Sequence, residues 1–324
     1  MSQLLPALCL LSAVFSPVSI VQAAEPPRQA REAGYVVNTF NSDVTKAETD
    51  IDKLYRSGKN WYLYNFWGSD VSSRGIVFSS DRPAYVINDG MNRNAQIATG
   101  ARTQSKNAAS FVGTAFGGGA YFEAALAFDP EQVRAGGLQA GWPSFWTLPV
   151  EVVLRNGKAQ WPDQPQNYEQ YAEIDILEYG LIHLGYDTRF YGSNVHHFYG
   201  NFRKTCQKGY CNHDLGLKGS LIELPRRVKL TDFHRYGLLW IPATDMHPGY
   251  LQRYFDDAPI GERVSWKPLP TDALPPPTGK DWAFSIIDQE HHVLILGSSQ
   301  TAPLHIKNVS VWQASEQHNI HSND

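Results

Sequence analysis

Short runs of β-branched, aromatic and aliphatic residues recur along most of the chain, and Gly, Pro, Asn and Asp separate them. Short apolar runs between turn-forming residues are typical of β-strands. We therefore predict strands at 60–66, 75–78, 84–87, 120–128, 171–179, 195–199, 233–241, 250–255, 293–296 and 304–312. Many short strands joined by turns indicate an all-β fold, specifically a two-sheet antiparallel β-sandwich or jelly roll.

One segment near the N-terminus has helical periodicity. Its apolar residues are Val44, Ala47, Ile51, Leu54 and Tyr55. They repeat at helical spacing, Ser42 or Asp43 could cap the N-terminus, and Gly58 would end the helix. We predict a short helix there. The preceding segment, 25–35, is rich in Pro and charged residues, and we expect it to be extended or mobile.

The first residues have the pattern of an export signal. Residues 4–24 carry no charge, Pro6 and Pro17 interrupt the apolar run, and it ends in Val21-Gln22-Ala23, with small residues where a signal peptidase cleaves. We predict cleavage after Ala23. The alternative is an uncleaved anchor, because residues 1–3 lack the usual Lys or Arg. No later stretch is long and apolar enough to span a bilayer.

Export changes how the cysteines are interpreted. Cys9 leaves with the signal peptide, so Cys206 and Cys211 remain as a pair in an oxidising compartment. We predict a disulfide between them that shapes a short loop. The alternative is a zinc site, with ligands drawn from Cys206, Cys211, His213, His196 and His197. Zinc requires four ligands in fixed geometry, and the paired CxxC spacing of zinc motifs is missing, which favours the disulfide.

The sequence Tyr-Ala-Glu-Ile-Asp-Ile-Leu-Glu-Tyr-Gly at 171–180 places three acids in an otherwise apolar strand. Strand periodicity puts Glu173 and Asp175 on one face. Glu178, five residues after Glu173, would face the other way in a regular strand. A β-bulge at 176–177 would return it to the acidic face. The two consecutive apolar residues there fit such an extra residue.

Three carboxylates on one face repel one another, and their pKa values must separate. That cost suggests a use in catalysis, since perturbed acids gather at active sites. Two carboxylates about 5–5.5 Å apart suit retaining glycoside hydrolysis, with one as nucleophile and the other as acid/base. From these residues alone, a calcium site and a solvent-facing acidic strand remain open alternatives.

The pattern Glu173-x-Asp175-x-x-Glu178 resembles the signature of glycoside hydrolase family 16, in the bulged form of laminarinases, agarases and carrageenases. Flanking segments are similar to strands of that family in the same order: 119–124 (GAYFEA), 141–149 (GWPSFWTLP), 232–240 (DFHRYGLLW), 254–256 (YFD) and 304–313 (LHIKNVSVWQ). The resemblance implies a concanavalin A-like jelly roll with a concave substrate cleft. It also implies Glu173 as nucleophile, Asp175 as its assistant and Glu178 as general acid/base.

The resemblance also sets the expected domain organisation. A catalytic domain at 39–315 follows the signal peptide (1–23) and an N-terminal extension (24–38), and a tail at 316–324 ends the chain. Asp257, Ala125 and Gly297-Ser298-Ser299 depart from the family pattern. None of these is one of the three acids, but they leave the substrate open.

Candidate sugar contacts lie on both sides of the acidic motif. Trp142 and Trp146 could stack on the apolar faces of sugar rings, or they could be core residues. The resemblance implies a His near the acid/base, which His196 or His197 would supply. Neighbouring strand residues face opposite ways, so one of the two would face the cleft, and we favour His196.

Charge and composition narrow the function further. The 324 residues are 42% hydrophobic and 12% aromatic with a net charge of −4, so the chain can bury a full core and lacks the basic footprint of a nucleic-acid binder. Arg189, Arg203 and Lys204 form a loose basic group that could contact a sulfated or uronic polymer. The net negative charge argues against that role.

We therefore predict a secreted protein, extracellular or periplasmic, that is an endo-acting retaining β-glycosidase. β-1,3-Glucan is the first expected substrate and agar-type galactans the second. The alternatives are a transglycosylase with the same acids, a non-catalytic lectin-like protein and a calcium-stabilised wall protein. We expect a monomer whose partner is a polysaccharide, with no nucleic acid and no membrane after cleavage. No cofactor is required, although the convex face could hold a structural calcium ion.

Overall fold

The computed structural model describes residues 25–66, 76–78, 85–86, 95–103, 111–137, 142–151, 168–206, 209–214, 220–270, 280–298 and 302–321. For 85–86, 202–206, 209–214 and 220 it describes the backbone alone. The predicted signal peptide lies outside these residues and stays a prediction. The longest helix in the described part has seven residues, and none there could span a membrane.

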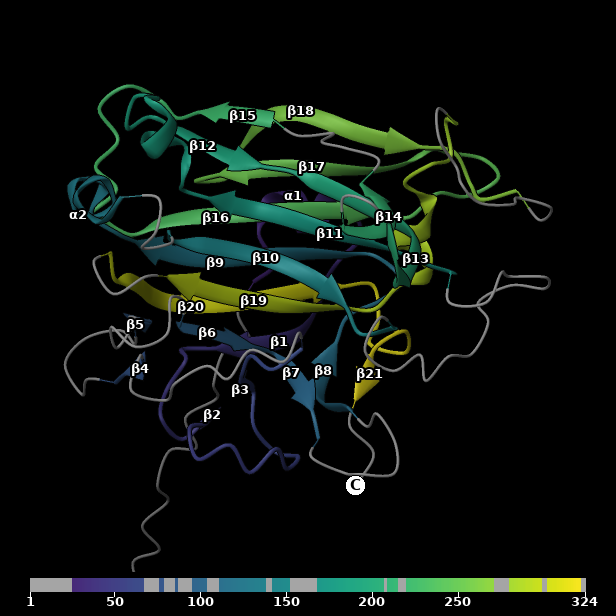
Figure 1. The fold of residues 1–324 in the computed structure, drawn as a ribbon, viewed down its shortest axis with the longest axis horizontal. Helices are drawn as coiled ribbons and strands as arrows, with labels where there is room; N and C mark the ends of the chain where they lie inside the picture. Colours follow the sequence, from purple (N-terminus) through teal and green to yellow (C-terminus); the bar gives the residue numbers. More distant parts are fainter. Residues whose placement is uncertain are drawn as a thin grey trace, which may run out of the picture.

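Two large β-sheets pack face to face, and their long strands run side by side across the molecule (Figure 1). The β9 sheet has the order β18 (Ala258–Trp266), β17 (Gly249–Phe255), β16 (His234–Ile241), β9 (Ala120–Ala127), β20 (Leu304–Gln313), β5 (Tyr85–Val86) and β4 (Ile76–Val77), and β1 (Val37–Ser42) also pairs with β20. Every pair in this sheet is antiparallel.

The β11 sheet has the order β14 (Gly209–Asp214), β13 (Val195–Cys206), β11 (Tyr168–Glu178), β10 (Ser144–Pro149), β19 (His292–Ser298), β6 (Ala95–Ala98), β3 (Trp61–Leu63) and β2 (Thr49–Asp50). Strand β12 (Phe190–Ser193) pairs with both β11 and β15 (Ser220–Glu223). The β2–β3 pair is parallel. A third, small sheet contains β21 (Ile320–His321), β8 (Phe111–Ala115) and β7 (Gly100–Arg102). The predicted two-sheet antiparallel β-sandwich is confirmed, and each predicted strand overlaps a strand of the structure.

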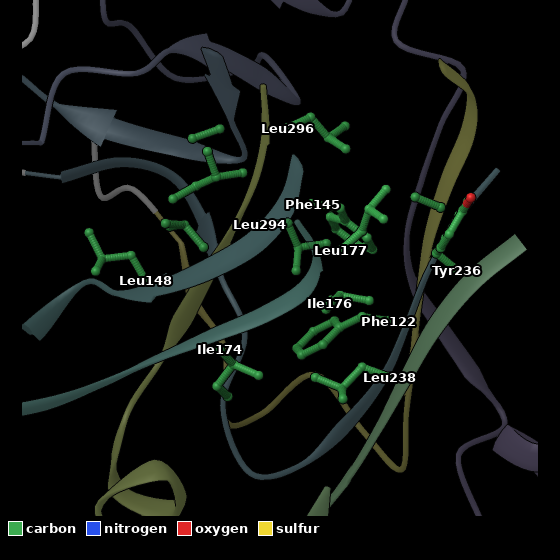
Figure 2. Close-up of a cluster of buried hydrophobic side chains, with 14 of the residues drawn as sticks. Phe122, Phe145, Leu148, Ile174, Ile176, Leu177, Tyr236, Leu238, Leu294 and Leu296 are labelled. Atoms are coloured by element: carbon green, nitrogen blue, oxygen red, sulfur yellow. The ribbon is translucent and has the colours of Figure 1, made fainter. Parts of the chain in front are cut away.

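The hydrophobic core lies between the two large sheets (Figure 2). Phe145 and Ile174 enter it from the β11 sheet, and Phe122 and Leu238 enter it from the β9 sheet. All four side chains are fully buried. Ile174 alternates with the acids Glu173 and Asp175, which is the strand periodicity that the sequence shows for β11.

The helix expected between Ser42 and Gly58 is wrong, and the segment forms turns and the short strand β2 instead. The Ser42 hydroxyl accepts a hydrogen bond from the Val44 N–H at 3.0 Å, and the Asp50 carboxylate accepts from the Leu54 and Tyr55 N–H groups at 3.0 and 2.5 Å. Val44 and Tyr55 have φ angles of 54° and 48°. Side chains that bind nearby backbone groups compete with helical hydrogen bonds, and they prevail here.

The expectation that 25–35 is extended or mobile is also wrong, because helix α1 (Arg28–Glu32) forms within it. Gln29 donates a hydrogen bond to the Tyr121 hydroxyl at 2.5 Å, and Ala30 is fully buried. Tertiary contact with the β9 sheet therefore stabilises a helix too short to form alone. Among the described residues, the other helical segments are α2 (Pro130–Gly136), η3 (Leu181–Leu184) and η4 (Ser285–Gln289).

We expect Leu177→Ala to lower the free energy of unfolding by about 2–5 kcal/mol, because it leaves a cavity where a fully buried side chain packs between the sheets. Urea unfolding would measure the loss. The matched control is Leu54→Ala, whose side chain is 58% exposed and whose change should stay within about 0.5 kcal/mol. Equal effects of the two substitutions would contradict this assignment of the core.

Candidate active site

A β-bulge in β11 brings the three acids of the motif to one face. Ser144 of β10 lies opposite Glu178 and Trp146 lies opposite Asp175, so three residues on β10 (144–146) span four on β11 (175–178). The extra residue leaves both Ile176 and Leu177 buried in the core, 1% and 0% exposed (Figure 2). Glu178 then shares a face with Asp175. The bulge expected from the sequence is present.

The acidic face has a buried centre and more accessible ends. Asp175 is only 2% exposed, whereas Glu173 and Glu178 are half-buried. His196 lies directly opposite Glu173 in the register, and its Nε2 is 3.5 Å from Asp175 Oδ2. One ligand atom from each of Glu173, Asp175 and His196 lies within 4.8 Å of the others. The structure therefore groups two acids and one imidazole tightly, with Glu178 adjoining them.

Burial raises the pKa of Asp175 to about 7. Its hydrogen bond with His196 acts in the opposite direction, and the negative charge of Glu178 raises the pKa further. Asp175 thus retains its proton over a wide pH range below neutrality. A protonated Asp175 between two other carboxylates reduces their mutual repulsion and can donate a hydrogen bond to one of them.

Asn194 fixes the orientation of Glu178. Its Nδ2 donates a hydrogen bond to Glu178 Oε2 at 2.9 Å. Asn194 stands between β12 and β13, where the pairing with β11 changes from Val195 opposite Ile174 to Gly192 opposite Glu178. Sequence reasoning missed this residue, and a break between two strand-like segments was the only available signal.

An arginine of the β9 sheet supports β11 from the core side, through a chain of hydrogen bonds. Arg253 of β17 is 1% exposed, and its guanidinium donates to the Ser193 hydroxyl at 2.9 Å and to the Ser193 carbonyl at 2.8 Å. The Ser193 hydroxyl in turn donates to the backbone carbonyl of Asp175 at 2.7 Å. Burial lowers the pKa of Arg253 to about 10. Sequence reasoning missed Arg253, although Leu251 and Phe255 on either side of it at strand spacing indicate an inward-facing residue.

The two predicted tryptophans occupy different positions. Trp146 lies opposite Asp175, is half-buried, and packs its ring 5.8 Å from the ring of Tyr64. Trp142 precedes β10, and its indole covers Gly180 so closely that a Cβ there would lie 2.7 Å from the ring. Trp146 is thus beside the acids, whereas Trp142 packs against the core and the backbone after Glu178.

The two predicted histidines face opposite sides of the β11 sheet. His196 is on the acidic face, where its ring stacks on that of Phe198 at 5.6 Å. His197 is fully buried on the core side, with its ring 5.8 Å from Tyr199 and 6.2 Å from Phe284. The structure therefore brings only His196 of this pair to the acids.

The side chains of Cys206 and Cys211 lie outside the described residues, as do those of His213, Arg203 and Lys204. At these positions the backbone alone is described, with Cys206 opposite Gly209 and Cys211 opposite Asn201. The Cys206–Cys211 disulfide stays a prediction. Mass spectrometry without reductant would test it, and two free thiols would refute it.

Glu173, Asp175 and His196 are also a candidate metal-binding group. Calcium prefers six to eight oxygen ligands, so a group that includes an imidazole is a poor match for it. Two acids and one His suit zinc better, as three ligands with an open fourth position. A metal bound there would occupy the same carboxylate oxygens that acid/base chemistry needs.

Comparisons with known proteins give weak likenesses only. No family model matches the chain, and no curated protein matches it. Among solved structures, an endo-1,3-beta-glucanase from Streptomyces sioyaensis is 15% identical, with 93% of this chain and 100% of that chain covered and a TM-score of 0.42.

SCLam, a non-specific endo-beta-1,3(4)-glucanase from family GH16, is 12% identical over 86% of this chain and 91% of that chain, with a TM-score of 0.39. The winged bean acidic lectin in complex with methyl-alpha-D-galactose is 8% identical over 84% of this chain and 96% of that chain, with a TM-score of 0.32. Glucanases and a lectin both occur among these likenesses, which therefore do not decide between catalysis and binding.

We expect Asp175→Asn to change how stability depends on pH. The pKa of Asp175 is raised in the folded protein to about 7, so the folded state binds more protons than the unfolded state between about pH 4 and pH 7. The wild type should lose stability across this range as pH rises, by at most ~1.4 kcal/mol per pH unit from this group. Urea unfolding at pH 4.5 and at pH 7.5 would measure this. The free energy of unfolding of the wild type should fall between the two pH values by more than that of the Asn variant. Parallel curves would contradict the assignment.

Proposed function

We propose that this protein is a retaining glycoside hydrolase that cleaves internal β-linkages of a polysaccharide. The observation that carries the proposal is the bulge in β11, which aligns Glu173, Asp175 and Glu178 on one face, with the central carboxyl buried and its pKa raised. A strand can keep three acids together in this way only at a cost in electrostatic repulsion, and a catalytic role accounts for that cost.

In the first step, Glu173 attacks the anomeric carbon while Glu178 transfers a proton to the glycosidic oxygen. The bond to the leaving sugar breaks, and a glycosyl-enzyme ester forms on Glu173. The hydrogen bond from Asn194 holds the Glu178 carboxyl in a fixed rotamer, so that its proton can be aimed at the oxygen.

In the second step, Glu178 has lost its proton and acts as a base toward water. The water attacks the anomeric carbon, the ester to Glu173 breaks, and the sugar leaves with its original anomeric configuration. Asp175 and His196 act through their neighbours as positioning residues. The Asp175 proton can be shared with an adjacent carboxylate, and His196 contacts Asp175 beside the nucleophile.

The position of the acids within the sheet supports cleavage inside a chain. Strand β11 lies in the interior of its sheet, with β13 and β12 on one side and β10, β19 and β6 on the other. A glycan crossing the strands can therefore extend past the acids in both directions. The sequence resemblance to laminarinases makes β-1,3-glucan the first substrate to test, followed by agar-type galactans. The N-terminal signal pattern supports export as the route to such a substrate.

The decisive experiment incubates the wild type with a panel of polysaccharides and identifies the new chain ends and their anomeric configuration by NMR. We expect retained β-anomers, and we expect Glu173→Gln to lower kcat by at least about 10³-fold because the nucleophile is lost. The matched control is Glu169→Gln, which changes another half-buried acid of β11. It should leave kcat unchanged.

Full activity in Glu173→Gln would refute the assigned roles. If the wild type binds a glycan but cleaves none, the lectin alternative is correct. Inverted products would contradict retention. Transfer of the glycosyl unit to an added oligosaccharide in preference to water would identify a transglycosylase, which uses the same two acids.

We expect cleavage to continue after dialysis against EDTA, because the proposed steps use only carboxyl groups and water. Added Zn²⁺ should inhibit by binding Glu173, Asp175 and His196, and His196→Asn should weaken this inhibition by removing one ligand. Initial rates with and without EDTA or Zn²⁺ would measure both effects. Activity that EDTA abolishes and a metal restores would overturn the metal-free mechanism.

A further inference from the structure

On the β12 side of Glu178, the next residue across the sheet is a glycine. Gly192 lies directly opposite Glu178, and Leu221 of β15 lies directly opposite Gly192. Paired residues of antiparallel strands share a face, so these three positions form one row across the acidic face. Gly192 contributes no side chain to it. A Cβ built there would meet nothing nearer than Asn194 Nδ2 at 3.4 Å, which is ordinary van der Waals contact.

Beyond Gly192, the same face carries exposed apolar side chains. Leu221 is 50% exposed. Phe190, two residues before Gly192 on β12, is on the same face and half-buried. Tyr186 is 43% exposed, and its ring lies 6.0 Å from that of Phe190 in an edge-to-face arrangement. We call Tyr186, Phe190 and Leu221 the apolar platform. Exposed apolar groups that adjoin a polar site commonly mark a ligand-binding surface.

The charges around the platform do not favour a polyanion. The Arg189 guanidinium lies 5.5 Å from the centre of the Phe190 ring. It forms ion pairs with Asp187, at 3.3 Å, and with Glu223. One cation is thus opposed by two carboxylates, and the acids of the site stand at the other end of the row. A sulfated or uronic chain would be repelled here, whereas a pyranose ring without charged substituents can place its apolar face on the platform.

We infer that the glycan runs from Glu178 over Gly192 onto the apolar platform, and that this path selects an uncharged polysaccharide. The inference rests on the proposed function for its catalytic end, because it extends the same site by at least a second sugar ring. Continuity with the acidic face is what identifies the occupant as a glycan. Gly192 serves as the floor under the first ring and the platform as the support for the next.

The first test compares substrates of different length. The double variant Tyr186→Ala/Leu221→Ala should lower kcat/KM at least about tenfold for long oligosaccharides. It should leave the shortest cleavable oligosaccharide unchanged, because that one ends over Gly192. Met246→Ala is the matched control, since Met246 is 81% exposed on the turn between β16 and β17. It should change neither value. Equal loss for short and long substrates, or no loss at all, would overturn the inference.

The second test fills the space over Gly192. The Gly192 backbone is outside the left-handed region, so substitution introduces no backbone strain. Gly192→Leu should lower kcat/KM at least about 100-fold for every oligosaccharide, with an unchanged circular dichroism spectrum and melting temperature. Gly192→Ala, the matched control, should stay within about threefold of wild type. Full activity in Gly192→Leu would place the glycan elsewhere and overturn the inference.

A binding measurement separates this inference from the proposed function. In the Glu173→Gln background, affinity electrophoresis would use gels containing a neutral β-1,3-glucan, neutral agarose or a sulfated galactan. We expect retardation by a neutral polymer, its loss in the Tyr186→Ala/Leu221→Ala variant, and no retardation by the sulfated one. Those results would support the platform even if the wild type cleaved nothing and the proposed function failed. Stronger retardation by the sulfated galactan, or no effect of the double variant, would overturn it.

Discussion

The acidic face depends on the burial of two consecutive residues of β11, Ile176 and Leu177, in the same core. In a regular strand one of them would face outward. Burying each side chain contributes roughly 1.5–3 kcal/mol, which offsets the disturbed pairing at a bulge. The change in alternation then turns Glu178 to the side of Asp175 and Glu173. Packing between the sheets and the position of the third carboxylate thus follow from one feature.

The bulge also shapes the neighbouring strand. His196 pairs with Glu173 and Gly192 pairs with Glu178, so β11 uses one residue more than β12 and β13 over this span. Asn194 lies at the break and directs its amide to Glu178. The same irregularity that aligns the acids therefore supplies the donor that orients one of them and leaves Gly192 beside it.

The acidic face is also supported on its core side, by a hydrogen-bonded arginine of the other sheet. Asp175 is nearly fully buried, and burial raises its pKa to about 7. On the core side, Arg253 reaches across from the β9 sheet to Ser193, which hydrogen-bonds the Asp175 carbonyl. A buried guanidinium requires such partners, since an unpaired charge in the interior is costly. The second sheet therefore holds β11 in place through hydrogen bonds in addition to apolar packing.

The sequence by itself determined the strands, the sandwich and the bulge, because each follows from the alternation of apolar and polar residues over a few positions. It misplaced a helix between Ser42 and Gly58, where apolar spacing was helical but the Ser42 and Asp50 side chains bind the local backbone. Only the tertiary structure decided that His196 faces the acids and that Asn194 and Arg253 support them. The positions of these three residues depend on strand register and on contacts between residues far apart in the chain. The packing of whole sheets determines both, and the local spacing of apolar residues contains no information about them.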